Sequence, residues 1–201
     1  MTTDITSAIT AHQDAFGLKL NAGAVERLAA YYDLVMEANP LVHLVGPSSA
    51  EEFAIRHLLE SLTLLKYLPN GSRFADVGTG AGLPSIPCLI VRDDLSATLI
   101  ESKKKKADFL TAAITQLALT KRAAVVNRQF EEAEPGHASV VTCRAIDKFP
   151  AKLPKLLKWA GSRIMILFAG PAIIHALQER GVKNNPHLLP MSEQRFIIEI
   201  L

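Results

Sequence analysis

The sequence is poor in cysteine and in long hydrophobic runs. Its two cysteines, Cys88 and Cys143, lie in apolar runs without C-x-x-C spacing. We therefore expect buried free thiols in a reducing compartment rather than a disulfide framework. The longest uncharged apolar run covers residues 81–91, contains two prolines, and is shorter than the roughly 20 residues of a spanning helix. The sequence therefore predicts no membrane segment.

The chain also has few aromatic residues, 6% of the total, and no large excess of positive or negative charge. The net charge is +2, from 22 basic and 20 acidic residues, which does not by itself indicate a nucleic-acid partner. The aromatic residues do not alternate with the basic ones, so stacking on extended single-stranded RNA is not predicted. Asp4 lies near the start, where no Lys or Arg occurs, so we expect no secretory signal and a cytoplasmic protein.

Hydrophobic residues make up 49% of the 201 residues, which is sufficient for a core without disulfides or metal. Apolar residues from Val25 to Met36 follow helical spacing, and Pro40 is expected to end that helix. A second helix is predicted over Ala50–Tyr67, before the turn sequence Pro-Asn-Gly at 69–71. Residues 1–70 are therefore predicted to form a helical N-terminal extension.

After this turn, short β-prone runs alternate with helical ones, which is typical of an α/β fold with a doubly wound, mostly parallel sheet. The predicted strands are Arg73–Val77, Ala97–Glu101, Ala123–Asn127, Ser139–Thr142, Ile164–Phe168 and Arg195–Leu201. The predicted helices are Ser85–Val91, Lys104–Ala118, Ala151–Ala160 and Ala172–Gly181. Residues 71–201 are predicted to form this second part of the chain.

The strongest local motif, D-V-G-T-G-A-G-L-P at 76–84, follows the first predicted strand and opens a helix. A dinucleotide-binding fingerprint requires glycine at position 83, where this chain has Leu83. The pattern D-x-G-x-G-x-G is typical of class I S-adenosylmethionine-dependent methyltransferases, with Gly78, Gly80 and Gly82 as its glycines. Glu101 ends the second strand, where a carboxylate can accept hydrogen bonds from both ribose hydroxyls of an adenosyl cofactor. A tight turn followed by a surface glutamate is the structural alternative.

Several further motifs occur in a fixed order with this loop. Residues 56–61 read R-H-L-L-E-S, residues 99–102 read L-I-E-S before a run of lysines, and residues 143–145 read C-R-A. Together with the glycine loop they resemble the motifs of the bacterial 16S ribosomal RNA guanine-N7 methyltransferases, also called glucose-inhibited division protein B. The resemblance extends from about Leu41 to the end of the chain and implies S-adenosylmethionine as cofactor, 16S rRNA or the small ribosomal subunit as partner, and no metal. We expect a monomer.

The resemblance also implies roles for individual residues. The cofactor-binding residues are expected to be Gly78, Gly80, Gly82, Leu83, Glu101, Phe130, Glu131 and Arg144. Guanine N7 is already a lone-pair nucleophile, so alignment with the methyl group matters more than a general base, and no catalytic triad is expected. Arg144 is the expected catalytic cation near guanine O6, or else forms a salt bridge with Asp76 or Glu101. His57 is expected either to contact the base or to be a packed histidine hydrogen-bonded between helices.

Basic clusters are the candidate rRNA contacts. Lys103–Lys106 opens a helix, where positive charge is unfavourable, so phosphate contact is one explanation and a solvated surface is the other. Lys148, Lys152 and Lys155 recur on one helical face with the same two explanations.

The chain departs from the family at three places. It has His43-Leu44-Val45 where the family has N-L-T, Ala81 where proline is common, and Ala169 where a lysine is usual. These departures keep other hypotheses open: a methyltransferase acting on another RNA or a small molecule, or a catalytically silent cofactor-binding assembly factor. Leu83 counts against an NAD-dependent dehydrogenase.

Overall fold

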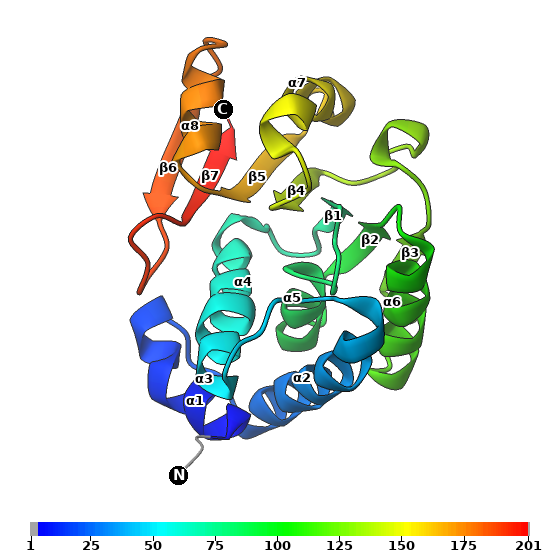
Figure 1. The fold of residues 1–201 in the computed structure, drawn as a ribbon, viewed down its shortest axis with the longest axis vertical. Helices are drawn as coiled ribbons and strands as arrows, with labels where there is room; N and C mark the ends of the chain where they lie inside the picture. Colours follow the sequence, from blue (N-terminus) through cyan, green and yellow to red (C-terminus); the bar gives the residue numbers. More distant parts are fainter. Residues whose placement is uncertain (1–3, 201) are drawn as a thin grey trace.

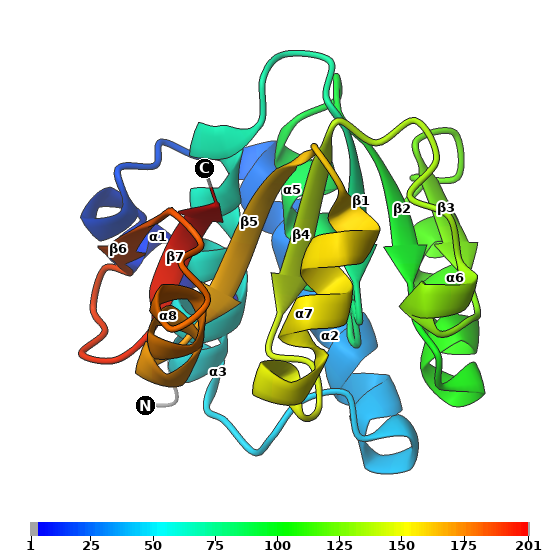
Figure 2. The same cartoon turned by 90° about the horizontal axis from the view of Figure 1, so that it is seen from above.

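The computed structural model describes residues 4–200, and a seven-stranded sheet lies at its centre. The strand order is β3-β2-β1-β4-β5-β7-β6, as Figure 2 shows from one edge to the other. The strands are β1 (Arg73–Val77), β2 (Ser96–Ile100), β3 (Ala123–Val126), β4 (Val140–Arg144), β5 (Ile164–Ala169), β6 (Asn184–Leu188) and β7 (Phe196–Ile200). The first five strands are parallel, and β7 is antiparallel to both of its neighbours. The predicted fold class is confirmed.

Helices cover both faces of the sheet (Figure 1). The N-terminal region contains α1 (Ile5–His12), η1 (Gln13–Phe16), α2 (Ala22–Val42), α3 (Ala50–Phe53), the π-helix η2 (Ala54–Leu59), α4 (Glu60–Leu62) and η3 (Thr63–Tyr67). The remaining helices are α5 (Ser85–Val91), α6 (Lys104–Gln116), η4 (Phe130–Glu132), α7 (Phe149–Ala160) and α8 (Pro171–Gln178). Helices α7 and α8 lie on one face, and the N-terminal helices lie with α5 and α6 on the other (Figure 1).

The pleat of the strands separates two hydrophobic clusters. Phe74 and Val140 point towards the N-terminal helices, whereas Ala75 and Val141 point towards α7 and α8, because successive side chains of a strand point to opposite faces. The N-terminal helices thus share one core with the sheet, and α2 packs directly against α5 and α6.

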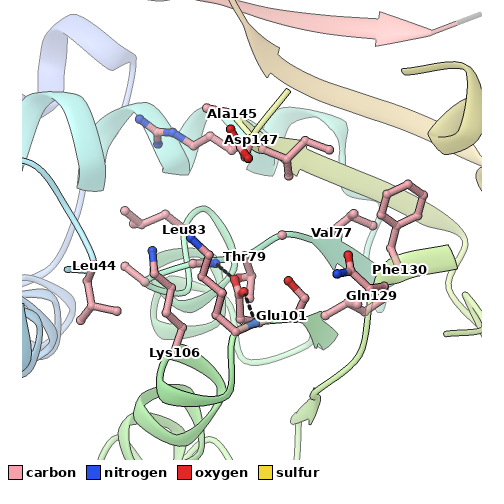
Figure 3. Close-up of a pocket in the computed structure, with 18 of the residues that line it drawn as sticks. Leu44, Val77, Thr79, Leu83, Glu101, Lys106, Gln129, Phe130, Ala145 and Asp147 are labelled. Atoms are coloured by element: carbon pink, nitrogen blue, oxygen red, sulfur yellow. Dashed lines mark hydrogen bonds between the residues drawn. The ribbon is translucent and has the colours of Figure 1, made fainter. Parts of the chain in front are cut away.

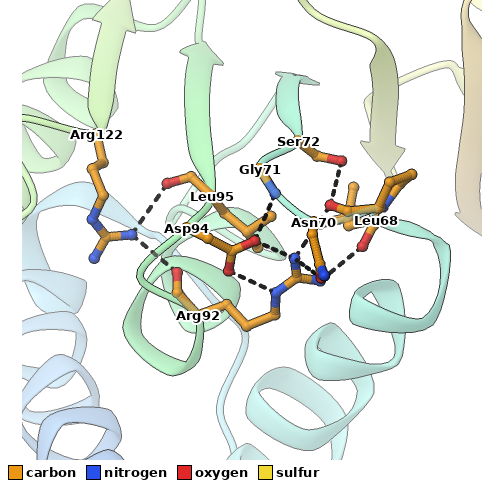
Figure 4. Close-up of polar contacts among 9 residues, drawn as sticks. Leu68, Asn70, Gly71, Ser72, Arg92, Asp94, Leu95 and Arg122 are labelled. Carbon is orange, nitrogen blue, oxygen red and sulfur yellow. Dashed lines mark hydrogen bonds and ion pairs between the residues drawn. The ribbon is translucent and has the colours of Figure 1, made fainter.

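The polar turn before β1 is fixed from the neighbouring α5–β2 connection (Figure 4). Arg92 donates hydrogen bonds to the backbone oxygens of Leu68 at 2.7 Å and Pro69 at 3.2 Å. Asp94 pairs with Arg92 and accepts the N–H of Gly71 at 2.7 Å. This arrangement lies at the amino-terminal end of β1 and holds the N-terminal helical region against the sheet.

Most predicted elements agree with the structure, and β1 and α5 agree at both ends. The strand β6 was not predicted, because its sequence N-N-P-H-L is mostly polar and contains a proline. A proline is tolerated there because β6 is an edge strand that pairs only with β7. Leu201, included in the last predicted strand, and residues 1–3 of the predicted extension lie outside the described residues.

The prediction that Pro40 ends its helix is wrong, because α2 continues to Val42. Pro40 lies in the last turn, where its missing N–H removes a single hydrogen bond. The helix ends instead at His43, which adopts a left-handed conformation with φ 53°. The side-chain oxygen of Asn39 then accepts the N–H groups of Leu44 at 2.7 Å and Val45 at 3.0 Å, which fixes the chain after the helix.

The predicted continuous helix over Ala50–Tyr67 is a succession of α-, π- and 3₁₀-helical turns. Its start has a capping box in which Ser49 and Glu52 bond to each other's backbone N–H. The π-helix is the unexpected part, and π-helical turns are frequent at functional sites.

Cys88 and Cys143 are buried free thiols, as predicted. Burial raises the pKa of both thiols, so neither is a reactive nucleophile. Among residues 4–200, no helix combines the length and the hydrophobicity needed to cross a membrane.

Candidate active site

A cavity of about 660 Å³ opens at the carboxyl ends of β1, β2 and β4 (Figure 3). Ligands of open α/β sheets bind beyond the carboxyl ends of the strands, at the point where the strand order reverses. In this sheet that point is beside β1. Leu44 and Phe130 lie at opposite ends of the cavity (Figure 3). The lining residues are Leu44, Val45, His57, Val77, Gly78, Thr79, Gly80, Ala81, Leu83, Ile100, Glu101, Ser102, Lys103, Lys106, Arg128, Gln129, Phe130, Arg144, Ala145, Ile146, Asp147 and Lys152.

Two glycines of the loop, Gly80 and Gly82, serve different purposes. Gly80 lines the cavity with φ +59°, and a Cβ added there would meet nothing closer than 3.9 Å, so it would enter open space. Gly82 does not line the cavity, and a Cβ there would lie 2.4 Å from Ile86 Cδ1. Gly80 therefore keeps space clear for a ligand, whereas Gly82 allows the following helix to pack.

Glu101 connects the loop to the start of α6. The residue is 6% exposed, and its carboxylate accepts the N–H of Gly80 at 3.0 Å and that of Lys103 at 2.8 Å. Since a carboxylate offers about four acceptor positions, two remain for a ligand diol. The Asn127 side chain donates to the backbone oxygen of Glu101 at 2.8 Å and fixes its position. The carboxylate, the cavity and the open face of Gly80 thus fit an adenosyl cofactor.

Asp76 lies beneath the loop and is fully buried. One of its carboxylate oxygens accepts the hydroxyls of Thr79 and Ser85, both at 2.6 Å, so β1, the loop and α5 are joined. The other oxygen, Oδ1, has no partner among the described residues. Burial raises the pKa of Asp76 to about 7. The Tyr31 hydroxyl donates to Ala81 O at 2.9 Å, so α2 also fixes the loop.

Arg144 lines the cavity, but its ion-pair partner differs from both predicted acids. The structure pairs it with Glu60 at 3.2 Å instead of Asp76 or Glu101. Arg144 also donates to Ser61 Oγ at 3.0 Å and to the backbone oxygen of Arg56. The Arg56 oxygen belongs to the π-helix η2, which contains the first four residues of the R-H-L-L-E-S motif. Glu60 was not predicted as the partner of Arg144, because no local pattern in the sequence links it to β4.

His57 both lines the cavity and packs against a neighbour. Its ring lies 4.9 Å from the Phe53 ring in an edge arrangement, and its buried Nδ1 has no partner within residues 4–200. Burial lowers the pKa of His57 to about 4, with a smaller contribution from Arg144. The imidazole is therefore neutral at neutral pH. The hydrogen bond expected for a histidine packed between helices is not made by Nδ1, and the ring contact is with Phe53 of the preceding turn.

Phe130 and Glu131, the two cofactor contacts predicted after the third strand, lie in different surroundings. Phe130 lines the cavity and packs edge-on against Trp159 with ring centroids 6.0 Å apart. Glu131 does not line it and instead faces Lys155 at 3.8 Å. The structure therefore supports a ligand contact for Phe130 but not for Glu131.

The lysines of the run Lys103–Lys106 also differ in whether they face the cavity. Lys103 and Lys106 line the cavity, while Lys104 pairs with Asp108 on the surface of α6. Within the Lys148, Lys152 and Lys155 stripe, only Lys152 reaches the cavity wall. Burial lowers the pKa of Lys106.

The structure adds lining residues that the motifs did not indicate. Thr79 and Ser102 directly adjoin predicted residues, so adjacency could have found them. Ile146 directly follows the C-R-A motif and reaches the glycine loop from the segment after β4, where its Cγ2 would lie 2.2 Å from a Cβ at Gly78. This approach between distant segments has no signal in the sequence. In residues 4–200 no group of three His, Cys, Asp or Glu side chains could hold a metal ion.

Comparison with known proteins identifies the family. The family model of rRNA small subunit methyltransferase G matches residues 24–167. The ribosomal RNA small subunit methyltransferase G of Neisseria meningitidis serogroup C is 36% identical over 147 residues, covering 73% of this chain and 69% of that protein. The protein of the same name from Halorhodospira halophila is 38% identical over 137 residues, covering 68% and 65%.

Solved structures confirm the fold. The cofactor-bound protein Rv0187 from MTB aligns with a TM-score of 0.60 and 14% identity, covering 87% of this chain and 89% of that one. A precorrin-6y C5,15-methyltransferase from Geobacter metallireducens aligns with a TM-score of 0.54 and 12% identity, covering 71% and 87%. The resemblance predicted from the sequence motifs is confirmed by the family match, and the chain belongs to the rRNA small subunit methyltransferase G family.

Proposed function

We propose that this protein transfers a methyl group from S-adenosylmethionine to N7 of a guanine in 16S rRNA of the small ribosomal subunit. The observation that carries the proposal is the cavity in which Glu101 and the open face of Gly80 meet, in a chain of this family. The substrate and the methylated atom come from the resemblance of the motifs to those of guanine-N7 methyltransferases.

The residues present fit the adenosyl cofactor. The carboxylate of Glu101 would accept the ribose hydroxyls, Gly78 and Gly80 would lie against the amino-acid end, and Phe130 would contact the opposite end of the ligand. When bound, the cofactor supplies an electrophilic methyl group. Gly82 supports this arrangement through packing rather than contact.

The chemistry requires alignment rather than proton abstraction, because guanine N7 attacks with its own lone pair. Among the described residues, three N–H bonds of Arg144 are used by Ser61, Arg56 and Glu60. A guanidinium has five N–H donors, so two remain for an acceptor such as guanine O6. The neutral His57 adds no positive charge to the cavity wall. Together they would orient the base without protonating N7.

The basic lining residues would contact rRNA phosphates around the cavity. These are Lys103, Lys106, Arg128 and Lys152. Such contacts add affinity that falls with salt concentration and leave sequence choice to the base pocket. We place the protein in the cytoplasm as a monomer, with residues 1–70 as a helical extension of a methyltransferase domain at 71–201.

Methyl transfer to small subunits tests the proposal directly. Labelled S-adenosylmethionine is incubated with the protein and with small subunits or stripped rRNA from cells that lack this gene. The modified base is then mapped by its alkali- and aniline-sensitive strand scission. A single N7-methylguanine is expected. Incorporation at another atom or in another RNA would contradict the proposal.

One observation favours another acceptor. Val45 lines the cavity where the family has threonine, so an apolar group replaces a hydroxyl on that wall. A methyltransferase for a different RNA or a small molecule would bind the cofactor but leave small subunits unlabelled. A silent cofactor-binding assembly factor would bind cofactor and ribosomal particles without turnover on any acceptor.

A further inference from the structure

A buried carboxylate joins three distant segments beside the cavity. Glu60 in α4 is fully buried, and its Oε2 accepts Arg144 from the end of β4 at 3.2 Å. Its Oε1 accepts the Nε–H of Arg195, from the loop that leads into β7, at 2.7 Å. One carboxylate thus lies between two guanidinium groups.

The three residues differ in their access to the cavity. Arg144 lines it, whereas neither Glu60 nor Arg195 does. The exposed fractions of the Arg144 and Arg195 side chains are 15% and 35%. Neither Glu60 nor Arg195 would therefore touch a ligand bound in this cavity directly, whereas Arg144, to which Glu60 is bonded, would.

The contacts of Arg144 fix the direction of its guanidinium. The group is planar and rigid, and it is held by Ser61 Oγ, the Arg56 backbone oxygen and the Glu60 carboxylate. All three acceptors come from the segment 56–61, where the π-helix is followed by α4. Arg195 donates to the other oxygen of Glu60, so both carboxylate oxygens have a partner.

We infer that Glu60 and Arg195 are positioning residues for methyl transfer, with Arg195 orienting Glu60 and Glu60 orienting Arg144. The inference rests on the proposed function for its kinetic consequence, while the geometric consequence for Arg144 is independent of it. It makes both the N-terminal helical segment and the C-terminal hairpin parts of the active-site architecture. A displacement of Arg144 by about 1 Å is enough to lower the rate by up to about 100-fold.

A double-variant cycle tests the route through Arg144. Arg195→Gln and Arg144→Lys are expected to lower kcat for rRNA methylation by between about 10-fold and 100-fold. The double variant is expected to match Arg144→Lys alone, since Arg195 would have nothing further to orient. Multiplied losses in the double variant would overturn the inference. Glu60→Gln is expected to behave as Arg195→Gln, and if it fails to fold, the cycle with the partly exposed Arg195 remains decisive.

Arg92→Gln is the matched control. It removes an arginine with a similar structural role at the opposite end of the sheet (Figure 4). We expect it to lower Tm while leaving kcat and KM unchanged. If Arg92→Gln lowered kcat as much as Arg195→Gln does, the effect would be structural and the inference would fail.

A measurement without substrate separates this inference from the proposed function. The Arg144 Nε–H resonance is identified in ¹⁵N spectra by its loss in Arg144→Lys. In Arg195→Gln it is expected to shift and broaden through added motion, and in Arg92→Gln to stay unchanged. An unaltered resonance in Arg195→Gln would overturn the inference. Absence of rRNA methylation by the unmodified protein would instead refute the proposed function.

Discussion

The carboxylate of Glu101 accepts the backbone N–H of Gly80 at 3.0 Å, so the expected ribose acceptor and the glycine loop are bonded to each other directly. The same carboxylate accepts the N–H of Lys103 at the start of α6. The position of Glu101 is thus fixed by the protein, and the side chain has little conformational freedom to lose when a ligand binds.

Glu101→Ala is expected to weaken cofactor binding by about 1–3 kcal/mol, the cost of losing a charged hydrogen-bond acceptor. Isothermal titration calorimetry with S-adenosylmethionine measures this change. Glu131→Ala is the control, because Glu131 does not line the cavity. The affinity of this variant for S-adenosylmethionine is expected to equal that of the unmodified protein. Equal losses in both variants would contradict the assignment of Glu101.

Gly80→Val is expected to abolish cofactor binding, since a branched side chain would enter the cavity. The left-handed φ of +59° adds strain of roughly 1–2 kcal/mol. Gly17→Val separates the two effects, because Gly17 has φ +67° with no atom within 4 Å of an added Cβ. We expect Gly17→Val to lower Tm with unchanged calorimetric affinity. Retained affinity in Gly80→Val would refute the cofactor placement.

Asp76 is expected to make the fold less stable as pH rises from about 4 to about 7. Its pKa is raised from 3.8 to about 7, so over this range the folded state holds a proton that the unfolded state has lost. The free energy of unfolding therefore falls with pH, by on the order of 4 kcal/mol in total. Urea unfolding of the unmodified protein and of Asp76→Asn at several pH values measures the effect as a difference.

His57 acts in the opposite direction, because its pKa is lowered to about 4 and stability rises from about pH 4 to 6.5. Both proteins in that comparison contain His57, so its contribution cancels in the difference. Parallel stability curves for the two proteins would show that Asp76 titrates normally.

The double variant Lys103→Ala/Lys106→Ala is expected to bind rRNA more weakly and to reduce the salt slope by about 1.4–1.8, since each of the two lost phosphate contacts removes about 0.7–0.9. Lys104→Ala/Lys105→Ala is the matched control, because these lysines do not line the cavity. Filter binding at several salt concentrations measures both slopes. If the control reduced the slope equally, the run would be a general basic surface.

Local signals were sufficient for several parts of this molecule. The glycine loop and the alternation of apolar runs located β1 and α5 at their observed ends. Glu101 was expected at the ribose position because it ends the predicted second strand, and in the structure it directly follows β2. These predictions hold because strand pleating, helix periodicity and positive φ at glycine depend on residues close together in the chain.

Other features depend on partners that no local pattern names. Pro40 stays within α2, and the strand β6 forms although its sequence contains Pro186. Both are tolerated because the missing N–H falls where few hydrogen bonds are lost: at a helix end, and in an edge strand.

Short-range patterns were enough to predict the fold class, the glycine loop, the position of Glu101 and the family motifs. The packing of residues 4–200 was needed to show that Arg144 pairs with Glu60, that Gly82 and Glu131 lie off the cavity wall, and that His57 Nδ1 is buried without a partner among those residues. The physical reason is that ion pairing and burial depend on packing between segments far apart in the chain. Short-range periodicity carries no information about which of several carboxylates an arginine meets.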